Sequence, residues 1–302
     1  MADSALAVRL RTHVERLDQP RSHRHAREAM AGAVAYVTGQ LAAAGWHVDR
    51  REFSLPGTWA AGVNLLAERP GTDPAVPAYL VGAHLDTVPG SPGADDNASG
   101  VACLLELAGR LPDTASVLLA VFDEEETGLV GSGVLARELV AERSLVAAIV
   151  LECVGYHSDR ARSQNLPPGI GLLYPRQYWR MRRRQLRGDW TLLAYRHDAA
   201  GLARRLAGHL DRLAGRRAAM RARDPLDLPG LGRLLRRYPG LADQFARSDH
   251  KPFWDLGVPA IQVTDTAEFR NPHYHRPTDT PDTLDYDRMA DLVNALVTVV
   301  NR

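Results

Sequence analysis

The chain has little of what would build a disulfide scaffold or a nucleic-acid surface. Among its 302 residues are two cysteines, and neither Cys103 nor Cys153 belongs to a spacing motif, so we expect two buried thiols and no disulfide framework. The formal net charge is +1, which gives no overall attraction to nucleic acid. Lysine occurs once, at Lys251, and we interpret the excess of arginine as compositional bias.

From the sequence we also expect neither a targeting segment nor a membrane span. No apolar run is long enough to span a bilayer. The opening MADSALAVRL has neither the basic start nor the long apolar core of a signal peptide. We therefore expect a cytoplasmic protein without a membrane span. A chain of 302 residues can bury a full core, which suits one large domain over residues 1–302.

Helix and strand patterns alternate along most of the chain. Helical spacing over about 4–17 and 26–44 is followed by two strand patterns, and 116–122 and 146–151 are continuous apolar runs typical of strands buried on both faces. A last amphipathic helix closes the chain. This alternation predicts an α/β fold with a largely parallel, doubly wound sheet.

An arginine-rich segment at about 156–247 interrupts this rhythm. Its arginines are typical of a solvated or ion-paired helix face. The segment is also compatible with a lid over a site or with an oligomer contact, and the sequence leaves these alternatives and the oligomeric state open. The N-terminal part carries histidines among arginines or on polar faces, and we expect them at the surface: His13, His23, His25 and His47.

One short stretch concentrates polar groups that could bind a cation. In LVGAHLDTVPGSPGADDNASG, residues 80–100, an apolar run leads directly into His84 and Asp86, and a Pro/Gly-rich loop returns to Asp95 and Asp96. Soluble proteins rarely place a histidine and three carboxylates so close together at a strand end without a cation to neutralise them. The stretch therefore predicts a metal site.

Similar groups recur at the expected carboxyl ends of later strands. Open α/β sheets bind ligands at that edge, so distant residues can meet in one crevice. Nitrogen and carboxylate ligands suit zinc or another divalent transition metal, whereas magnesium and calcium prefer oxygen. Two histidines and three carboxylates balance two divalent ions with one bridging hydroxide better than they balance a single ion. The groups collected in this way are His84, Asp86, Asp95, Asp96, Glu125, Glu126, Glu152, His273 and His275.

Each piece alone has an ordinary structural interpretation. An HxD pair is common by chance, adjacent aspartates before a helix can cap it, and a glutamate run after a strand is often a solvated turn. Their joint occurrence, in this order and each at a strand end, is what favours a site.

These pieces resemble the co-catalytic di-zinc aminopeptidase family, which also includes glutamate carboxypeptidase II and the glutaminyl cyclases. The matching motifs are AHLDTVPGSPGADDNASG, FDEEETGLVGS, LECVGY, SDHKPFWDLGVPAI and NPHYHRPTDT, within about 79–155 and 248–290. The resemblance implies a three-layer α/β/α fold with a mixed, mostly parallel central sheet. It also implies two zinc ions, with ligands at His84, Asp96, Glu126, Glu152 and His275, where Asp96 is the bridging residue.

The resemblance assigns further roles around these ligands. Glu125 matches the general base, Asp86 matches the carboxylate that orients the first histidine, and Tyr274 matches a hydrogen-bond donor to the tetrahedral oxyanion. Asp95 is expected to be a neighbour of the site, and Glu124 has no counterpart. The peptide bond after the bridging aspartate is often cis in the family. Supporting positions are expected at Asp249, His250 and His273.

The implied activity is metal-assisted hydrolysis of the N-terminal amide bond of a peptide or aminoacyl amide. Glu125 would take the proton of the attacking water and deliver it to the leaving amine. Three alternatives remain. The first is glutaminyl cyclotransfer, which generally uses a single zinc. The second is a related metallo-amidohydrolase or carboxypeptidase, whose closing histidine motif differs from YHRPTDT. The third is a non-catalytic binding relative without metal.

Overall fold

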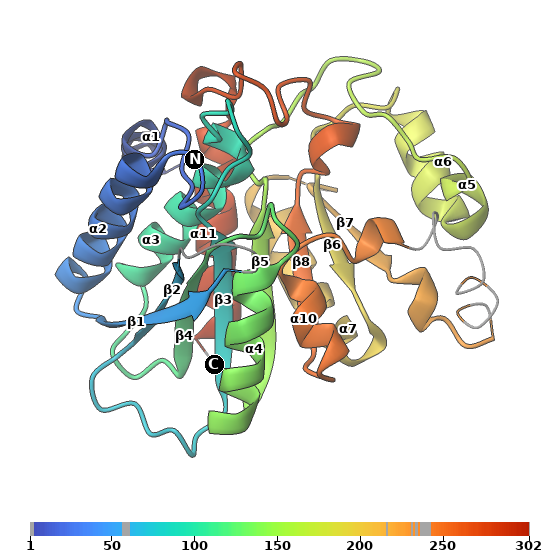
Figure 1. Cartoon of the computed structure of the whole chain (residues 1–302). Coiled ribbons are helices and arrows are strands. Elements are labelled where there is room, and N and C mark those ends of the chain that lie inside the picture. The colour runs from blue at the N-terminus through green and yellow to red at the C-terminus, as the bar shows by residue number, and fades with distance from the viewer. Residues whose placement is uncertain are drawn as a thin grey trace.

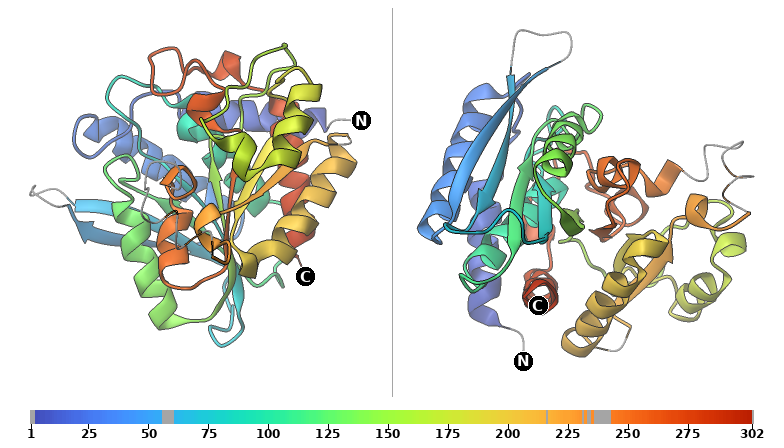
Figure 2. Two further views of the ribbon diagram at one scale, coloured as in Figure 1. Left: turned by 90° about the vertical axis from the view of Figure 1, so that its right-hand side faces the viewer. Right: turned by 90° about the horizontal axis from the view of Figure 1, so that it is seen from below.

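The computed structural model describes residues 3–55, 61–215, 217–230, 232, 235 and 243–301, and they form one eight-stranded sheet with helices on both faces (Figures 1 and 2). The strands lie in the order β1-β2-β4-β3-β5-β8-β6-β7. They are β1 (His47–Ser54), β2 (Ala61–Glu68), β3 (Ala78–His84), β4 (Val117–Phe122), β5 (Leu145–Glu152), β6 (Thr191–Tyr195), β7 (Ala219–Arg223) and β8 (Ala260–Thr264).

The sheet is mixed and mostly parallel, as the sequence predicts. The pairs β3–β4, β3–β5, β5–β8 and β6–β7 are parallel, and β1–β2, β2–β4 and β6–β8 are antiparallel. The central strands are continuous apolar runs because each is covered on both faces. In β4, for example, all six residues of VLLAVF are buried.

Two apolar cores sandwich this sheet. Alternate residues of one strand point to opposite faces, so Leu119 and Val121 join one core while Leu118 and Ala120 join the other. The first core contains α1, α2, α3, α7 and α11, and the second contains α4 and α10. These helices are α1 (Ser4–Arg16), α2 (Arg27–Ala43), α3 (Gly100–Ala108), α4 (Val130–Glu142), α7 (Ala200–Leu213), α10 (His250–Asp255) and α11 (Tyr286–Val300).

The arginine-rich segment is part of the same fold. It supplies β6 and β7 to one end of the sheet, and α5 (Ile170–Leu173) and α6 (Pro175–Arg183) lie beyond that end (Figure 1). The sequence did not predict these two strands, because they are only five residues long and separated by α7. Several of its arginines bind backbone carbonyls or carboxylates, as when Arg184 pairs with Asp189.

The surface prediction for the N-terminal histidines is wrong for His13. Its ring is buried between α1 and α3, with Nδ1 at 2.7 Å from the hydroxyl of Tyr36 and Nε2 at 3.2 Å from Glu106. His25 and His47 are exposed, and His23 is half-buried against Asp123. A buried histidine satisfied by two polar partners is not distinguishable from a surface one by spacing alone.

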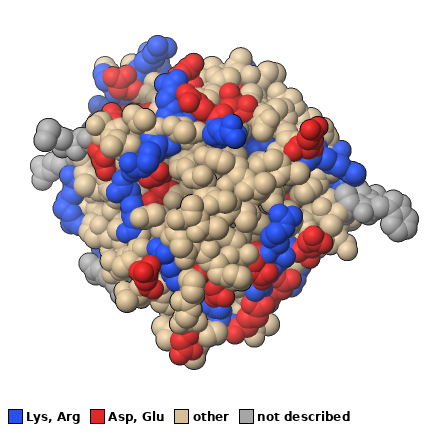
Figure 3. Space-filling model, turned by 90° about the vertical axis from the view of Figure 1, so that its left-hand side faces the viewer, with Lys and Arg blue, Asp and Glu red and all other residues tan. Residues whose placement is uncertain are grey.

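Charged side chains of both signs are interspersed on the face formed by the N-terminal helices (Figure 3). Arg9 with Glu106 and Arg11 with Glu15 are examples of pairing there. Both cysteines are buried free thiols, as predicted. Among the described residues, no helix is long and apolar enough to cross a membrane.

Candidate metal centre

The predicted site lies at the carboxyl edge of the parallel strands. His84 is the last residue of β3, Glu125 and Glu126 follow β4, and Glu152 is the last residue of β5. In the sheet β3 pairs with both β4 and β5 in parallel, so these three chain ends are adjacent. Asp96 comes from a kinked turn (Ala94–Ser99) just before α3, in which Asp96 and Asn97 have non-helical backbone angles.

The five residues that match metal ligands form two groups of three that share Asp96. In the first, which is fully buried, Nε2 of His84 lies 3.2 Å from Oδ1 of Asp96 and 3.4 Å from Oε2 of Glu152. In the second, Nε2 of His275 lies 3.0 Å from Oδ2 of Asp96 and 3.3 Å from Oε2 of Glu126. The carboxylate of Asp96 thus offers one oxygen to each group, which is the geometry of a bridging ligand.

Several atoms of these groups are buried and have no hydrogen-bond partner among the residues that the structure describes. They include Nε2 of His84, both carboxylate oxygens of Asp96 and Oε1 of Glu126. Buried polar atoms nearly always have a hydrogen-bond partner, so this concentration of unpaired nitrogen and oxygen atoms fits a site that binds cations. Imidazole nitrogen and carboxylate oxygen are suitable ligands for zinc.

The electrostatics also indicate a demand for positive charge. Burial lowers the pKa of His275, but contacts with Asp96 and Glu126 outweigh it and raise that pKa to about 10. Burial and the charge of Asp96 raise the pKa of Glu126 to about 7. A cluster of carboxylates that raises the pKa of a neighbouring histidine in this way has an excess of negative charge, which a bound cation would neutralise.

Asp86 organises the turn that carries the two glutamates. Its Oδ1 accepts a hydrogen bond from the backbone N–H of Glu125 at 3.0 Å, and its Oδ2 accepts one from Glu126 at 3.1 Å. The same carboxylate lies 3.6 Å from Nδ1 of His84. Asp86 therefore contacts His84 on the side of its ring opposite Nε2, the atom that lies near Asp96 and Glu152.

Glu125 and Tyr274 lie beside the groups and line the same cavity. Burial raises the pKa of Glu125 well above its usual value, although the charge of His84 opposes this and that of Glu152 adds to it. The ring of Tyr274 stacks on His275 at 3.8 Å between centroids. Burial and the nearby carboxylate of Asp96 raise the pKa of Tyr274, so its phenol stays protonated and can donate a hydrogen bond.

Two carboxylates that sequence reasoning set apart from the ligands have other partners. Asp95 accepts hydrogen bonds from the backbone N–H of Gly155 at 2.9 Å and from Nδ2 of Asn271 at 2.7 Å. Glu124 pairs with Arg24 at 2.6 Å and accepts a hydrogen bond from the hydroxyl of Thr127 at 2.7 Å. The Asp96–Asn97 peptide bond is cis.

The supporting positions differ in how close they come. Asp249 is fully buried, and its pKa rises to about 7 through burial, an effect that the charge of His84 opposes. His250 turns to the carbonyl of Phe245 and packs edge-on against Trp254. His273 contacts the hydroxyl of Thr278. None of these three is a member of the two groups of ligands found among the described residues.

Sequence reasoning missed three residues that hold the site together. The hydroxyl of Ser248 donates to Oε2 of Glu152 at 2.8 Å. The fully buried Arg21 donates to the carbonyls of the loop that links His84 to Asp96, including those of Leu85 and Pro92. Asp279 accepts from the backbone at Asp95 and Asp96. Of these three residues, Ser248 and Asp279 lie within the motifs quoted above. Their residue types alone do not indicate which contacts they make.

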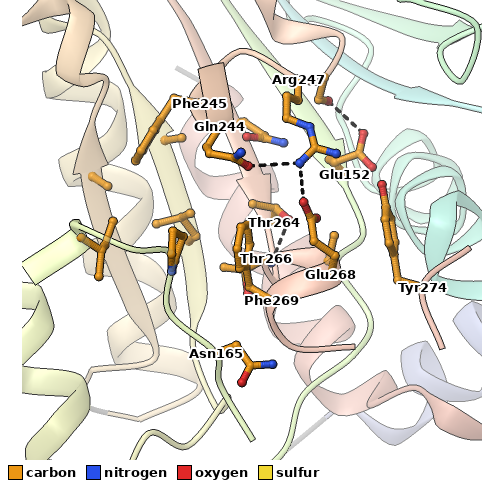
Figure 4. A pocket seen from close by; sticks show the side chains of 18 of the residues that line it. Glu152, Asn165, Gln244, Phe245, Arg247, Thr264, Thr266, Glu268, Phe269 and Tyr274 are labelled. Atoms are coloured by element: carbon orange, nitrogen blue, oxygen red, sulfur yellow. Dashed lines mark hydrogen bonds and ion pairs between the residues drawn. The ribbon is translucent and has the colours of Figure 1, made fainter. Parts of the chain in front are cut away.

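A cavity of about 500 Å³ opens from the metal-ligand groups toward the arginine-rich segment. Its far part is largely apolar and is formed by Leu166, Ile170, Tyr174, Met181, Trp190, Leu192, Met220 and Phe245. Figure 4 shows Tyr274 and Glu152 at one end, with Arg247 reaching Glu268 and Gln244. Of the described lining residues, Arg247 is the only arginine or lysine.

An α/β sheet with histidine and carboxylate groups at its carboxyl edge is an arrangement that suits a metal-binding enzyme. The model of peptidase family M28 matches residues 64–191 and 233–300, more than half of the chain, and the chain belongs to this family. The resemblance seen in the sequence is thereby confirmed.

One relative matches a large part of the chain. The chain is 34% identical over 241 residues to Uncharacterized protein YfbL of Escherichia coli (strain K12), an alignment covering 74% of the chain and 66% of that relative. It spans about two thirds, or less, of the length of the curated relatives that it matches.

Two solved structures share the fold. An aminopeptidase from Aneurinibacillus sp. strain AM-1 superposes with a TM-score of 0.65 at 16% identity, covering 97% of this chain and 93% of that one. Porphyromonas gingivalis glutaminyl cyclase superposes with a TM-score of 0.67 at 21% identity, covering 98% and 97%. The predicted fold class is confirmed.

Proposed function

We propose that this chain is a zinc-dependent aminopeptidase that binds two metal ions and hydrolyses the N-terminal amide bond of peptides. The observation that carries the proposal is the sharing of Asp96 between two complete groups, one with His84 and Glu152 and one with Glu126 and His275. Zinc bound there would polarise the scissile carbonyl and lower the pKa of water toward neutrality.

The protein groups supply proton transfer and orientation. Glu125 is a half-buried carboxylate beside both groups, and its raised pKa suits a base that receives a proton from water and returns it to the leaving amine. Tyr274 presents a protonated phenol next to His275 and can donate to the developing oxyanion. Asp86 keeps Glu125 in place through its backbone.

The cavity supports an apolar N-terminal side chain in the substrate. Aromatic and thioether side chains such as Trp190, Met181 and Met220 pack together in its wall. The ligand carboxylates lie at the opposite end, where a free α-amine would be neutralised. A leucine or phenylalanine residue therefore fits with its side chain in the apolar part and its amine toward the metal-ligand groups.

Glutaminyl cyclotransfer is the second candidate, because a glutaminyl cyclase shares the fold. It needs no second metal, whereas here both groups of ligands and the base are complete. The experiment compares leucyl-p-nitroanilide, its N-acetylated form and a glutaminyl peptide. We expect hydrolysis of leucyl-p-nitroanilide and no hydrolysis of its N-acetylated form. Release of ammonia with ring closure of the glutaminyl peptide, without hydrolysis, would favour the cyclase, and equal cleavage of the N-acetylated form would favour an amidohydrolase.

A further inference from the structure

Two of the candidate ligands come from loops far apart in the sequence. Asp96 lies in the turn before α3, and His275 lies in the loop between β8 and α11. His275 has a left-handed backbone, with φ of 58°, and its side chain is 36% exposed. In contrast, His84 and Glu152 are anchored on adjacent strands and are buried. The loop that carries His275 therefore needs a contact that fixes its position relative to Asp96.

Asp279 makes this connection. Its Oδ1 accepts a hydrogen bond from the backbone N–H of Asp95 at 2.9 Å, and its Oδ2 accepts one from the N–H of Asp96 at 3.2 Å. Its backbone carbonyl accepts a third, from Ala94, at 3.2 Å. Asp279 is fully buried and lies four residues after His275, so one residue of the histidine loop binds three successive residues of the aspartate turn.

The other side of this turn is held independently. Arg21 donates to the carbonyls of Pro92 at 2.8 Å and Gly93 at 3.1 Å. A side chain at Gly93 would meet the carbonyl oxygen of Asp96 at 2.4 Å, so the turn is closely packed. Arg21 and Asp279 thus hold the turn from two sides. The loop that carries His275 also contributes Asn271, which donates to Oδ2 of Asp95 at 2.7 Å, but it is Asp279 of this loop that binds the backbone N–H of Asp96.

We propose that Asp279 is a positioning residue that sets the spacing between Asp96 and His275 and so determines metal affinity at the Asp96–Glu126–His275 group. The inference rests on the proposed two-metal function. Asp279 touches neither metal-facing atom of these ligands, and it acts by binding backbone N–H groups. The first group shares Asp96, but His84 and Glu152 are placed by strand ends and Glu152 is also bound by Ser248, so Asp279 should affect this group less.

The test is cobalt binding to chelator-treated protein, followed by visible absorption and by equilibrium dialysis with elemental analysis. Asp279→Asn keeps the shape but replaces one acceptor oxygen with a donor, and Asp279→Ala removes both acceptors. Asp282→Asn is the matched control, because Asp282 lies three residues further on and its side chain is 81% exposed. A His84→Ala background removes the first group and leaves the second to be measured alone.

We expect the wild type to bind two equivalents and Asp279→Asn to lose about 10- to 100-fold in affinity for one of them, with a smaller loss for the other, which shares Asp96. Adding Asp279→Asn to His84→Ala should weaken the remaining equivalent by the same factor, and Asp282→Asn should match the wild type. If Asp279→Ala does not fold, Asp279→Asn decides. Unchanged affinities, or equal loss of both equivalents in a folded variant, would overturn the role of Asp279. A wild type that binds fewer than two equivalents would instead overturn the two-metal proposal.

Discussion

The backbone N–H of Glu125 donates a hydrogen bond to Oδ1 of Asp86 at 3.0 Å. Oδ2 of Asp86 also accepts a hydrogen bond from the backbone N–H of Glu126, and the carboxylate lies near Nδ1 of His84. One buried side chain therefore contacts the backbone of the proposed base, the backbone of one proposed ligand and the ring of another. Asp86 therefore links the turn that carries Glu125 and Glu126 to His84.

Substitution of Asp86 should weaken both metal binding and turnover. Asp86→Asn turns one of the two acceptors into a donor, so an N–H of the turn at Glu125 or Glu126 loses its partner. We expect a loss of about 10- to 100-fold in zinc affinity, and a lower kcat that persists at saturating zinc. Equilibrium dialysis and steady-state kinetics measure the two effects. A normal kcat at saturating zinc would mean that Asp86 does not position Glu125.

Glu125→Gln should separate chemistry from metal binding. The amide keeps the size of the side chain but cannot accept a proton, so kcat should fall by about 10²- to 10⁴-fold while the zinc content stays at the wild-type level. Elemental analysis of the purified variant beside its rate on leucyl-p-nitroanilide makes the measurement. Near-normal activity would remove Glu125 from the role of base.

Met181→Ala should change substrate preference. Met181 is buried in the wall of the cavity and packs with Trp190 and Met220. Its truncation removes apolar contact with a large side chain, so kcat/KM for leucyl and phenylalanyl substrates should fall by about tenfold or more, with alanyl substrates little affected. Leu172→Ala, at an exposed position that does not line the cavity, is the control. A uniform loss across all substrates would argue against a side-chain pocket here.

His250 should make stability depend on pH. Burial lowers its pKa to about 4, and the nearby charges of Arg196 and Lys251 act in the same direction. The unfolded chain, with a pKa near the ordinary value of about 6.5, then binds more protons than the folded one between these values, so stability falls as pH drops through that window. Relative to His250→Gln, zinc-free wild type should lose about 1.4 kcal/mol per pH unit there. Parallel pH profiles of the free energy of unfolding would contradict a buried neutral His250.

The sequence predicts the fold well where elements are long and uniformly patterned. The apolar run of β4 and the helical spacing of α11 can be recognised in the sequence, because each pattern reflects which residues of the element are buried. The short strands β6 and β7 do not, since five residues within arginine-rich sequence carry little periodicity.

The candidate ligands are likewise visible in the sequence because their motifs follow strand ends. The residues that hold them are not. Arg21 binds backbone carbonyls through tertiary contacts, and Asp279 joins segments more than 180 residues apart in contacts that no local spacing encodes. Such links can be found only once the topology has brought the loops together.

The most direct test of the two-metal account is the zinc content of the protein titrated beside its activity. Chelator-treated protein should be inactive toward leucyl-p-nitroanilide, should bind two zinc ions per chain, and should regain activity as they bind. Asp96→Asn, which alters the carboxylate shared by both groups, should weaken both equivalents. Full activity in metal-free protein, or saturation at a single zinc with Asp96→Asn unaffected, would contradict the account.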